Sequence, residues 1–183
     1  MSLTKDRQQN SYAALQAAFG YTSPMQGPRI SKVVVSTGVG KKRDKKVLEV
    51  IEDRLSKITG QKPAPRAARL SIASFKVREG DTVGLQTTLR GARMYDFLDK
   101  LVHIALPRTR DFRGLSPRAI DDMGNMTIGI KENTIFPETS DEDLKDVFGL
   151  AVTVVTTAKS KAEAEAFFRH LGFPLIVDSS EKR

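Results

Sequence analysis

Residues 84–105, GLQTTLRGARMYDFLDKLVHIA, contain the two patterns that decide the fold. Apolar and polar side chains alternate over 84–90, which predicts a strand with one face toward a core and one polar face. Apolar residues recur three and four positions apart over 93–105, which predicts an amphipathic helix that ends before Pro107. The side chains on the polar face of the strand would be Gln86, Thr88 and Arg90.

Elements of the same kind are predicted on both sides of this stretch. Several of the strands are one-sided, which favours an α+β fold: an antiparallel β-sheet with helices packed on one face and the other face open to a ligand. The prolines after Gly60 permit only an edge strand or an extended segment. Helices are predicted at 4–19, 45–59 and 160–171, and strands at 29–36, 126–131 and 150–157. Gly20, Gly60 and Gly172 are expected to end the three helices, and Ser160 and Glu163 form a capping box at the start of the last one.

The length and composition fit one globular domain. We expect a single domain over 1–178, composed of an N-terminal part (1–92) and a C-terminal part (93–178), with a mobile tail at 179–183. The chain has no cysteine, which excludes disulfides and thiolate metal sites. No membrane span or secretory signal is visible, so we expect a cytoplasmic protein.

Positive charge is concentrated rather than interspersed. The whole chain carries 30 Lys/Arg and 22 Asp/Glu, a net charge of +8. Residues 28–80 hold 14 of the basic residues and only 5 of the acidic ones, whereas residues 132–150 are acidic. A basic block of this kind predicts a polyanionic partner, and nucleic acid is the favoured one.

The residues needed for catalysis or metal binding are missing from the sequence. His103 and His170 are the only histidines, and no Glu or His lies at metal-ligand spacing from either. Gly38-Val39-Gly40-Lys41 resembles part of a phosphate loop, but the first glycine and the Ser/Thr of that motif are absent. We therefore expect no enzyme activity, cofactor, metal or small-molecule substrate.

Cations gather at the start of the helix predicted at 45–59. Positive charges there oppose the helix dipole, so a bound phosphate is one explanation, and a solvated loop is the other. The cations are Lys41, Lys42, Arg43, Lys45 and Lys46.

The basic block continues through Arg66 and Arg69 into an exposed loop predicted at 70–82. Phe75 lies among cations in this loop, where it either stacks on RNA bases or pins the loop to the core. A second cluster follows Pro107, where an extended arginine run would suit phosphates or an acidic protein. Its members are Arg108, Arg110 and Arg113.

Several stretches together resemble the family of bacterial large-subunit ribosomal protein five. The longest is the run from Thr88 to Pro117. The others are PRISKVVVSTGVG (28–40), TGQKP (59–63), SFKVREG (74–80), IFPE (135–138) and VTTAKS (155–160).

The resemblance implies a structural constituent of the large ribosomal subunit that binds 5S ribosomal RNA in the central protuberance. The family's main 5S contacts fall on Ser36, Gln61 and Thr88, and family members usually carry Asn where Ser36 stands. We add Lys32, Arg90, Arg66, Arg69 and the cations of 41–46 as further 5S contacts. Large-subunit ribosomal RNA is a further expected partner.

Two more contacts are implied by the resemblance. The matching loop approaches the peptidyl-site transfer RNA (P-site tRNA), and here it comprises Phe75, Lys76, Val77, Arg78, Glu79 and Gly80. The segment Arg108–Arg113 corresponds to the region that reaches small-subunit head protein thirteen in an intersubunit bridge.

Two rival hypotheses are weaker. An enzyme acting on RNA would need a general base or metal site that the sequence does not offer. A peripheral membrane protein would need a basic amphipathic helix, but the 45–59 helix carries Glu49, Glu52 and Asp53 on its polar side.

Overall fold

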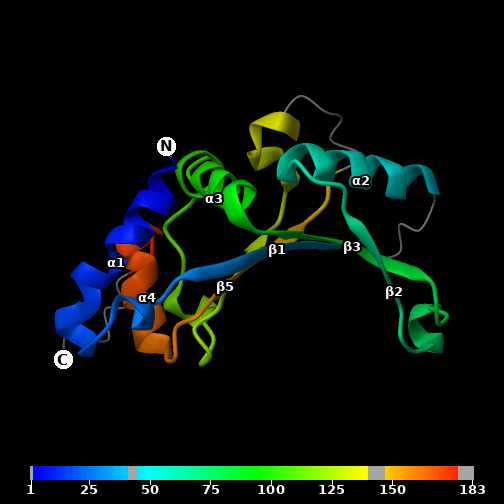
Figure 1. Ribbon diagram of the computed structural model, residues 1–183. Helices are drawn as coiled ribbons and strands as arrows, with labels where there is room; N and C mark the ends of the chain where they lie inside the picture. The colour runs from blue at the N-terminus through cyan, green and yellow to red at the C-terminus, as the bar shows by residue number, and fades with distance from the viewer. Residues whose placement is uncertain (1, 41–44, 140–146, 177–183) are drawn as a thin grey trace. The chain divides into compact units, whose positions relative to one another are not determined.

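A computed structural model describes residues 2–40, 45–139 and 147–176, except for the side chain of Lys45. Its α+β fold contains a five-stranded antiparallel sheet in the order β2-β3-β1-β5-β4 and four α-helices (Figure 1). The predicted fold class is therefore confirmed. The strands are β1 (Ile30–Gly38), β2 (Ala64–Ala67), β3 (Thr82–Leu89), β4 (Met126–Ile130) and β5 (Leu150–Thr156). The helices are α1 (Leu3–Phe19), α2 (Lys45–Thr59), α3 (Gly91–Lys100) and α4 (Lys161–Leu171).

The chain forms two compact units, each built from separate stretches of sequence. Unit 1 comprises Met1–Val33, Arg90–Ile128 and Thr153–Arg183, and unit 2 comprises Val34–Leu89 and Gly129–Val152. The division of 1–178 at residue 92 that we expected from the sequence stays a prediction.

Unit 1 is held together by α1, α3 and α4. The two terminal helices α1 and α4 lie side by side (Figure 1). Phe168 of α4 is buried in the core, and its ring lies edge to face with that of Phe173, just after the helix, at 5.2 Å. As predicted, Gly172 ends α4 in the left-handed conformation (φ 93°). A glycine is also needed here for space, because a Cβ would clash with the Arg7 guanidinium. This guanidinium donates a hydrogen bond to the Leu171 carbonyl at 2.8 Å.

The predicted capping box of α4 is present, and its glutamate also bonds to a residue far away in the sequence. Ser160 accepts a hydrogen bond from the Glu163 amide, and the Glu163 carboxylate accepts from the Lys159 amide at 2.7 Å. The other carboxylate oxygen accepts from the Tyr21 hydroxyl in a buried pair. Burial, together with the bond to Glu163 and its charge, raises the pKa of Tyr21 well above its usual value.

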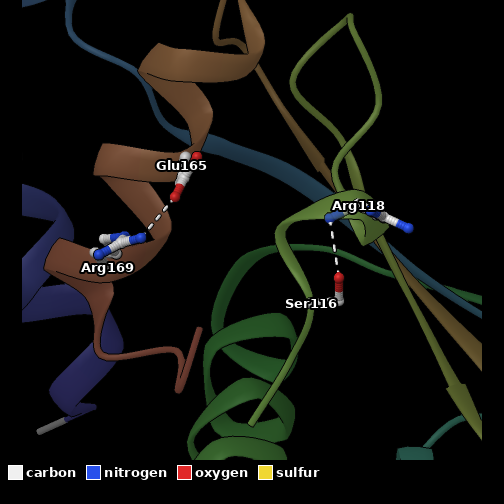
Figure 2. A network of polar contacts seen from close by, with 4 residues as sticks. All are labelled: Ser116, Arg118, Glu165 and Arg169. Carbon is white, nitrogen blue, oxygen red and sulfur yellow. Dashed lines mark hydrogen bonds and ion pairs between the residues drawn. The ribbon is translucent and has the colours of Figure 1, made fainter. Parts of the chain in front are cut away.

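Two polar contacts of unit 1 join residues that are close in the sequence. Figure 2 shows Ser116 accepting from the backbone N–H of Arg118 at 3.3 Å, with the Arg118 guanidinium pointing away from that contact. It also shows Arg169 bound to Glu165 one turn earlier at 2.6 Å. Exposed pairs of this kind contribute little to stability.

The helix predicted at 93–105 changes geometry before its end. It is α-helical to Lys100 and then a π-helix over Leu101–Ala105, closed by a hydrogen bond from the Leu106 amide to the Leu101 carbonyl at 2.9 Å. The buried apolar spacing fits either helix, so the sequence did not predict the change.

Unit 2 packs α2 against β3, with Leu55, Ile58 and Leu89 almost fully buried between them. Gly60 closes α2 with φ 68°, as expected. The segment after Pro63 forms β2, which pairs antiparallel with β3 and lies at the edge of the sheet, as predicted. Gly84 of β3 approaches β1 so closely that a Cβ would lie 2.7 Å from the Thr37 carbonyl oxygen.

Candidate nucleic-acid interface

The two central strands have one buried and one half-exposed face, as the alternation predicted. On β3, Leu85 and Leu89 are buried, whereas Gln86 and Thr88 are half-exposed. On β1, Val35 is buried next to the half-exposed Ser36. The half-exposed face is therefore polar, and it is not the face that packs on α2.

Two of the predicted 5S contacts are in contact with each other in unit 2. Gln61 follows α2, and its side-chain amide donates to the backbone carbonyl of Thr88 at 3.4 Å. The two residues are 27 positions apart in the sequence. Within the described part of the chain, the Thr88 hydroxyl has no hydrogen-bond partner, so it is available to a ligand as donor and acceptor.

Ser36 lies on β1, the strand next to β3. Its hydroxyl also has no partner among the described residues. Beside it an open hollow of 490 Å³ is lined by Ser36, Gly38, Gly129 and Gly149 together with Ile130, Lys131 and Leu150. The three glycines have no side chain, so another molecule can approach the strand backbone closely at those positions.

Three of the predicted cationic contacts are exposed in unit 2. Arg66 on β2 is exposed, and its Nε–H donates to the Gln86 side-chain oxygen at 2.6 Å. Arg69 is exposed in the loop that follows, and Lys46 is exposed on the first turn of α2. Lys41, Lys42 and Arg43 lie outside the described residues, as does the side chain of Lys45. The predicted phosphate contacts of this segment therefore remain predictions.

Two further predicted 5S contacts belong to unit 1. Lys32 is half-buried on β1, and Arg90 is exposed just before α3. The structure thus brings Gln61 and Thr88 into contact, and it places Ser36 and Arg66 on the two strands next to β3. Lys32 and Arg90 are described only within unit 1.

The surface of α2 contains an acidic groove, which is unfavourable for binding nucleic acid. Glu49, Glu52 and Asp53 line an open groove of 680 Å³, and Gln61 lines it as well. Lys57 pairs with Asp53 at 2.8 Å and Lys62 with Glu52 at 3.2 Å, so part of this charge is offset locally. The remaining carboxylates would repel phosphate, which favours the sheet face over this groove as a surface for nucleic acid.

The loop of 70–82 is exposed, as predicted, and hydrogen bonds within the loop stabilise its conformation. Ile72 and Val77 form a two-way backbone bridge with bonds of 2.9 and 3.2 Å. Asp81 accepts from the Arg78 amide at 2.9 Å, and Ser71 accepts from the Glu79 amide at 2.9 Å. Lys76 (φ 51°) and Gly80 (φ 90°) make the turns.

Phe75 is 71% exposed at the tip of this loop. Of the two alternatives that the sequence left open, pinning to the core is therefore wrong. Leu70 and Ile72, which come earlier in the same loop, are exposed as well, so the loop carries exposed apolar side chains near the cations Lys76 and Arg78 in the sequence.

The arginine cluster after Pro107 is exposed, but the expectation of an extended run is wrong. The backbone turns repeatedly, because the amides of Arg108, Thr109 and Phe112 donate to carbonyls three residues earlier. Asp111 adopts a left-handed conformation (φ 55°) that sharpens the bend. All three arginines are exposed, and Arg110 lies 3.9 Å from the Asp111 carboxylate.

The structure adds Gln86 and its bond to Arg66 to the candidate interface. The alternation on the strand placed Gln86 on the polar face, but no sequence signal predicted that Arg66 would reach it. Among the described residues, no group of three His, Cys, Asp or Glu side chains could hold a metal ion. No helix of the described chain is long and apolar enough to cross a membrane.

Fold and surface together define a class: α+β proteins with an antiparallel sheet whose open face is polar, and with exposed cations in the same unit. Comparison with known proteins narrows this class. Residues 23–78 match the family model described as ribosomal protein L5, and residues 82–175 match the model of the C-terminus of the same ribosomal family.

Curated relatives agree with both matches. The large ribosomal subunit protein uL5 of Anaeromyxobacter sp. (strain K) is 48% identical over 163 residues, 88% of this chain and 91% of the relative. The uL5 of Desulfatibacillum aliphaticivorans is 50% identical over 91% of this chain and 93% of the relative. The uL5 of Rubrobacter xylanophilus is 48% identical over 95% of this chain and 98% of the relative.

The chain belongs to the ribosomal protein L5 (uL5) family. It is a large-subunit ribosomal protein with a structural role and ribosomal RNA as partner, and it is not an enzyme. The resemblance found in the sequence is thereby confirmed.

Proposed function

We propose that this protein anchors 5S ribosomal RNA in the central protuberance through the polar sheet face of unit 2. The observation that carries the proposal is the contact between Gln61 and Thr88, which unites two residues that the family resemblance singled out independently. The adjacent strand contributes Ser36. Hydroxyl and amide groups on one face suit the phosphates, 2′-hydroxyls and base edges of RNA.

Gln61 serves the site in two ways. Its N–H···O contact with the Thr88 carbonyl, at 3.4 Å, is long and leaves the side chain able to turn toward a ligand. Its position at the end of α2, fixed by the turn at Gly60, holds it at the rim of the sheet. Thr88 contributes its hydroxyl from the strand itself.

The direct test is binding of purified 5S RNA to Gln61→Ala and Thr88→Ala variants. Each should weaken binding by about 1–3 kcal/mol, because a buried hydrogen bond with the RNA would be removed. Gln9→Ala and Thr22→Ala make the same exchanges at exposed positions of unit 1 and serve as controls. Wild-type affinity in both site variants would refute the assignment of this face.

The proposal extends to two further contacts of the ribosome. The loop of 75–80 would approach the P-site tRNA, supported by the exposed Phe75 between cationic residues, since exposed aromatic rings stack on bases. The exposed arginines of 108–113 would reach small-subunit head protein thirteen in an intersubunit bridge, since guanidinium groups pair well with acidic partners.

A further inference from the structure

Gln86 lies in the middle of the polar face of unit 2. The register pairs it with Ala64 on β2. On the other side of β3, the Val39 amide donates to the Val83 carbonyl at 3.0 Å, and continuing this antiparallel register along the strands puts Ser36 opposite Gln86. Because alanine and serine are short, the Gln86 amide stands above both neighbours.

Arg66 determines which way that amide points. Its Nε–H donates to the Gln86 Oε1 at 2.6 Å. Since Nε–H can only donate, the amide oxygen must face Arg66 and the amide nitrogen must face away from it. Arg66 has room to lean along the sheet because its own partner in the register is Gly84, which has no side chain.

The outward nitrogen of Gln86 has no acceptor among the described residues. It presents two N–H donors on the face that also carries Ser36 and Thr88. The Arg66 guanidinium adds positive charge on the side of the amide oxygen. The face therefore offers donors with a fixed direction rather than an amide free to flip.

We propose that Arg66 and Gln86 act as one RNA-recognising unit, in which Arg66 orients Gln86 to donate to an acceptor atom of the RNA. This inference rests on the proposed function, because it assumes that the RNA lies on this face. A phosphate oxygen, a 2′-hydroxyl or a base acceptor would satisfy the amide, whereas a base amino group would not. Gln86 would thus be a specificity residue and Arg66 its positioning residue.

The competing explanation is a cross-strand pair that only fastens the edge strand β2. Such a pair would affect folding and leave binding unchanged once the variants are folded. The two explanations are separated by a double-mutant cycle with Arg66→Met, Gln86→Met and the double variant, read as the dissociation constant for purified 5S RNA. Thermal unfolding of each variant checks that it is folded.

If the pair acts as a unit, Gln86→Met should weaken 5S binding about tenfold, the value of one hydrogen bond to a charged or strongly polar acceptor. Arg66→Met should cost clearly less in the Gln86→Met background than in the wild type. Gln86→Glu keeps a partner for Arg66 but removes the donors, so it should bind no better than Gln86→Met. Arg118→Met, which removes an exposed arginine of unit 1, is the control for the removal of one charge.

Equal costs of Arg66→Met in both backgrounds would overturn the inference, because Arg66 would then act as an independent cation. Wild-type binding by Gln86→Met or Gln86→Glu would overturn it too. A wild-type protein that fails to prefer 5S RNA to an unrelated RNA would instead refute the proposed function. The wild-type measurement therefore distinguishes the two failures.

Discussion

The N-terminus of α1 is capped by a carboxylate from another helix. The Ser2 side chain makes no capping bond to its own helix. Instead, Asp99 of α3 accepts from the Ser2 hydroxyl at 2.6 Å, from the Thr4 amide at 2.9 Å and from the Thr4 hydroxyl. Asp99→Asn keeps the shape but removes the charge, so it should destabilise the protein by about 1–2 kcal/mol, as loss of a helix cap does.

The effect should depend on pH with a definite sign. Burial alone would raise the pKa of Asp99, but the hydrogen bonds from Ser2 and Thr4 outweigh it and hold that pKa below its usual value. The native state therefore binds the proton less readily than the unfolded chain. The stabilisation is fully present above the unfolded carboxyl pKa of about 3.9 and is lost as the pH falls through the lower native pKa.

Urea unfolding followed by circular dichroism measures this effect. The gap in the free energy of unfolding between wild type and Asp99→Asn should be largest near neutral pH and should narrow in acid. Asp96→Asn, an exposed position on the same helix, is the matched control. Equal losses in the two variants, or a gap that does not change with pH, would refute the reasoning.

Three further predictions concern the sheet, the exposed loop and the basic segment. Gly84→Ala should destabilise the protein by about 1–3 kcal/mol in urea unfolding, because its Cβ would lie 2.7 Å from the Thr37 carbonyl oxygen. An unchanged midpoint of urea unfolding would mean that the strands separate easily. Phe75→Ala should leave stability within about 0.5 kcal/mol but weaken P-site tRNA binding to reconstituted ribosomes by about 1–3 kcal/mol, and unchanged tRNA binding would argue against stacking. Replacing Lys41, Lys42 and Lys45 with Gln should reduce the salt dependence of 5S binding by about 0.7 for each phosphate that is no longer neutralised, whereas an unchanged slope would indicate a solvated segment.

Local patterns in the sequence predicted most of the fold. Alternation placed Leu85 and Leu89 inside and Thr88 outside, because side chains of a strand point to opposite faces. Glycine marked the ends of α1, α2 and α4, since the left-handed turn after a helix favours a residue without a Cβ. These features depend on a few neighbouring residues, so the sequence contains all that is needed to predict them.

Contacts between distant segments could not be predicted in this way. The cap from Asp99 to Thr4 and the buried pair of Tyr21 and Glu163 join residues that lie 95 and 142 positions apart. The bond between Arg66 and Gln86 depends on the register of β2 against β3, which alternation alone does not fix. The candidate site was predicted in its residues through the family resemblance, whereas its geometry required the structure.

Specific binding of 5S RNA by the polar face of unit 2 underlies both proposals. The most direct measurement is a salt titration of binding to purified 5S RNA, with an unrelated folded RNA of equal length in parallel. We expect tight binding to 5S RNA alone that persists at physiological salt, because directed hydrogen bonds are less sensitive to salt than phosphate contacts. Equal binding to both RNAs, disappearing together as salt rises, would contradict it and leave only a basic surface without specificity.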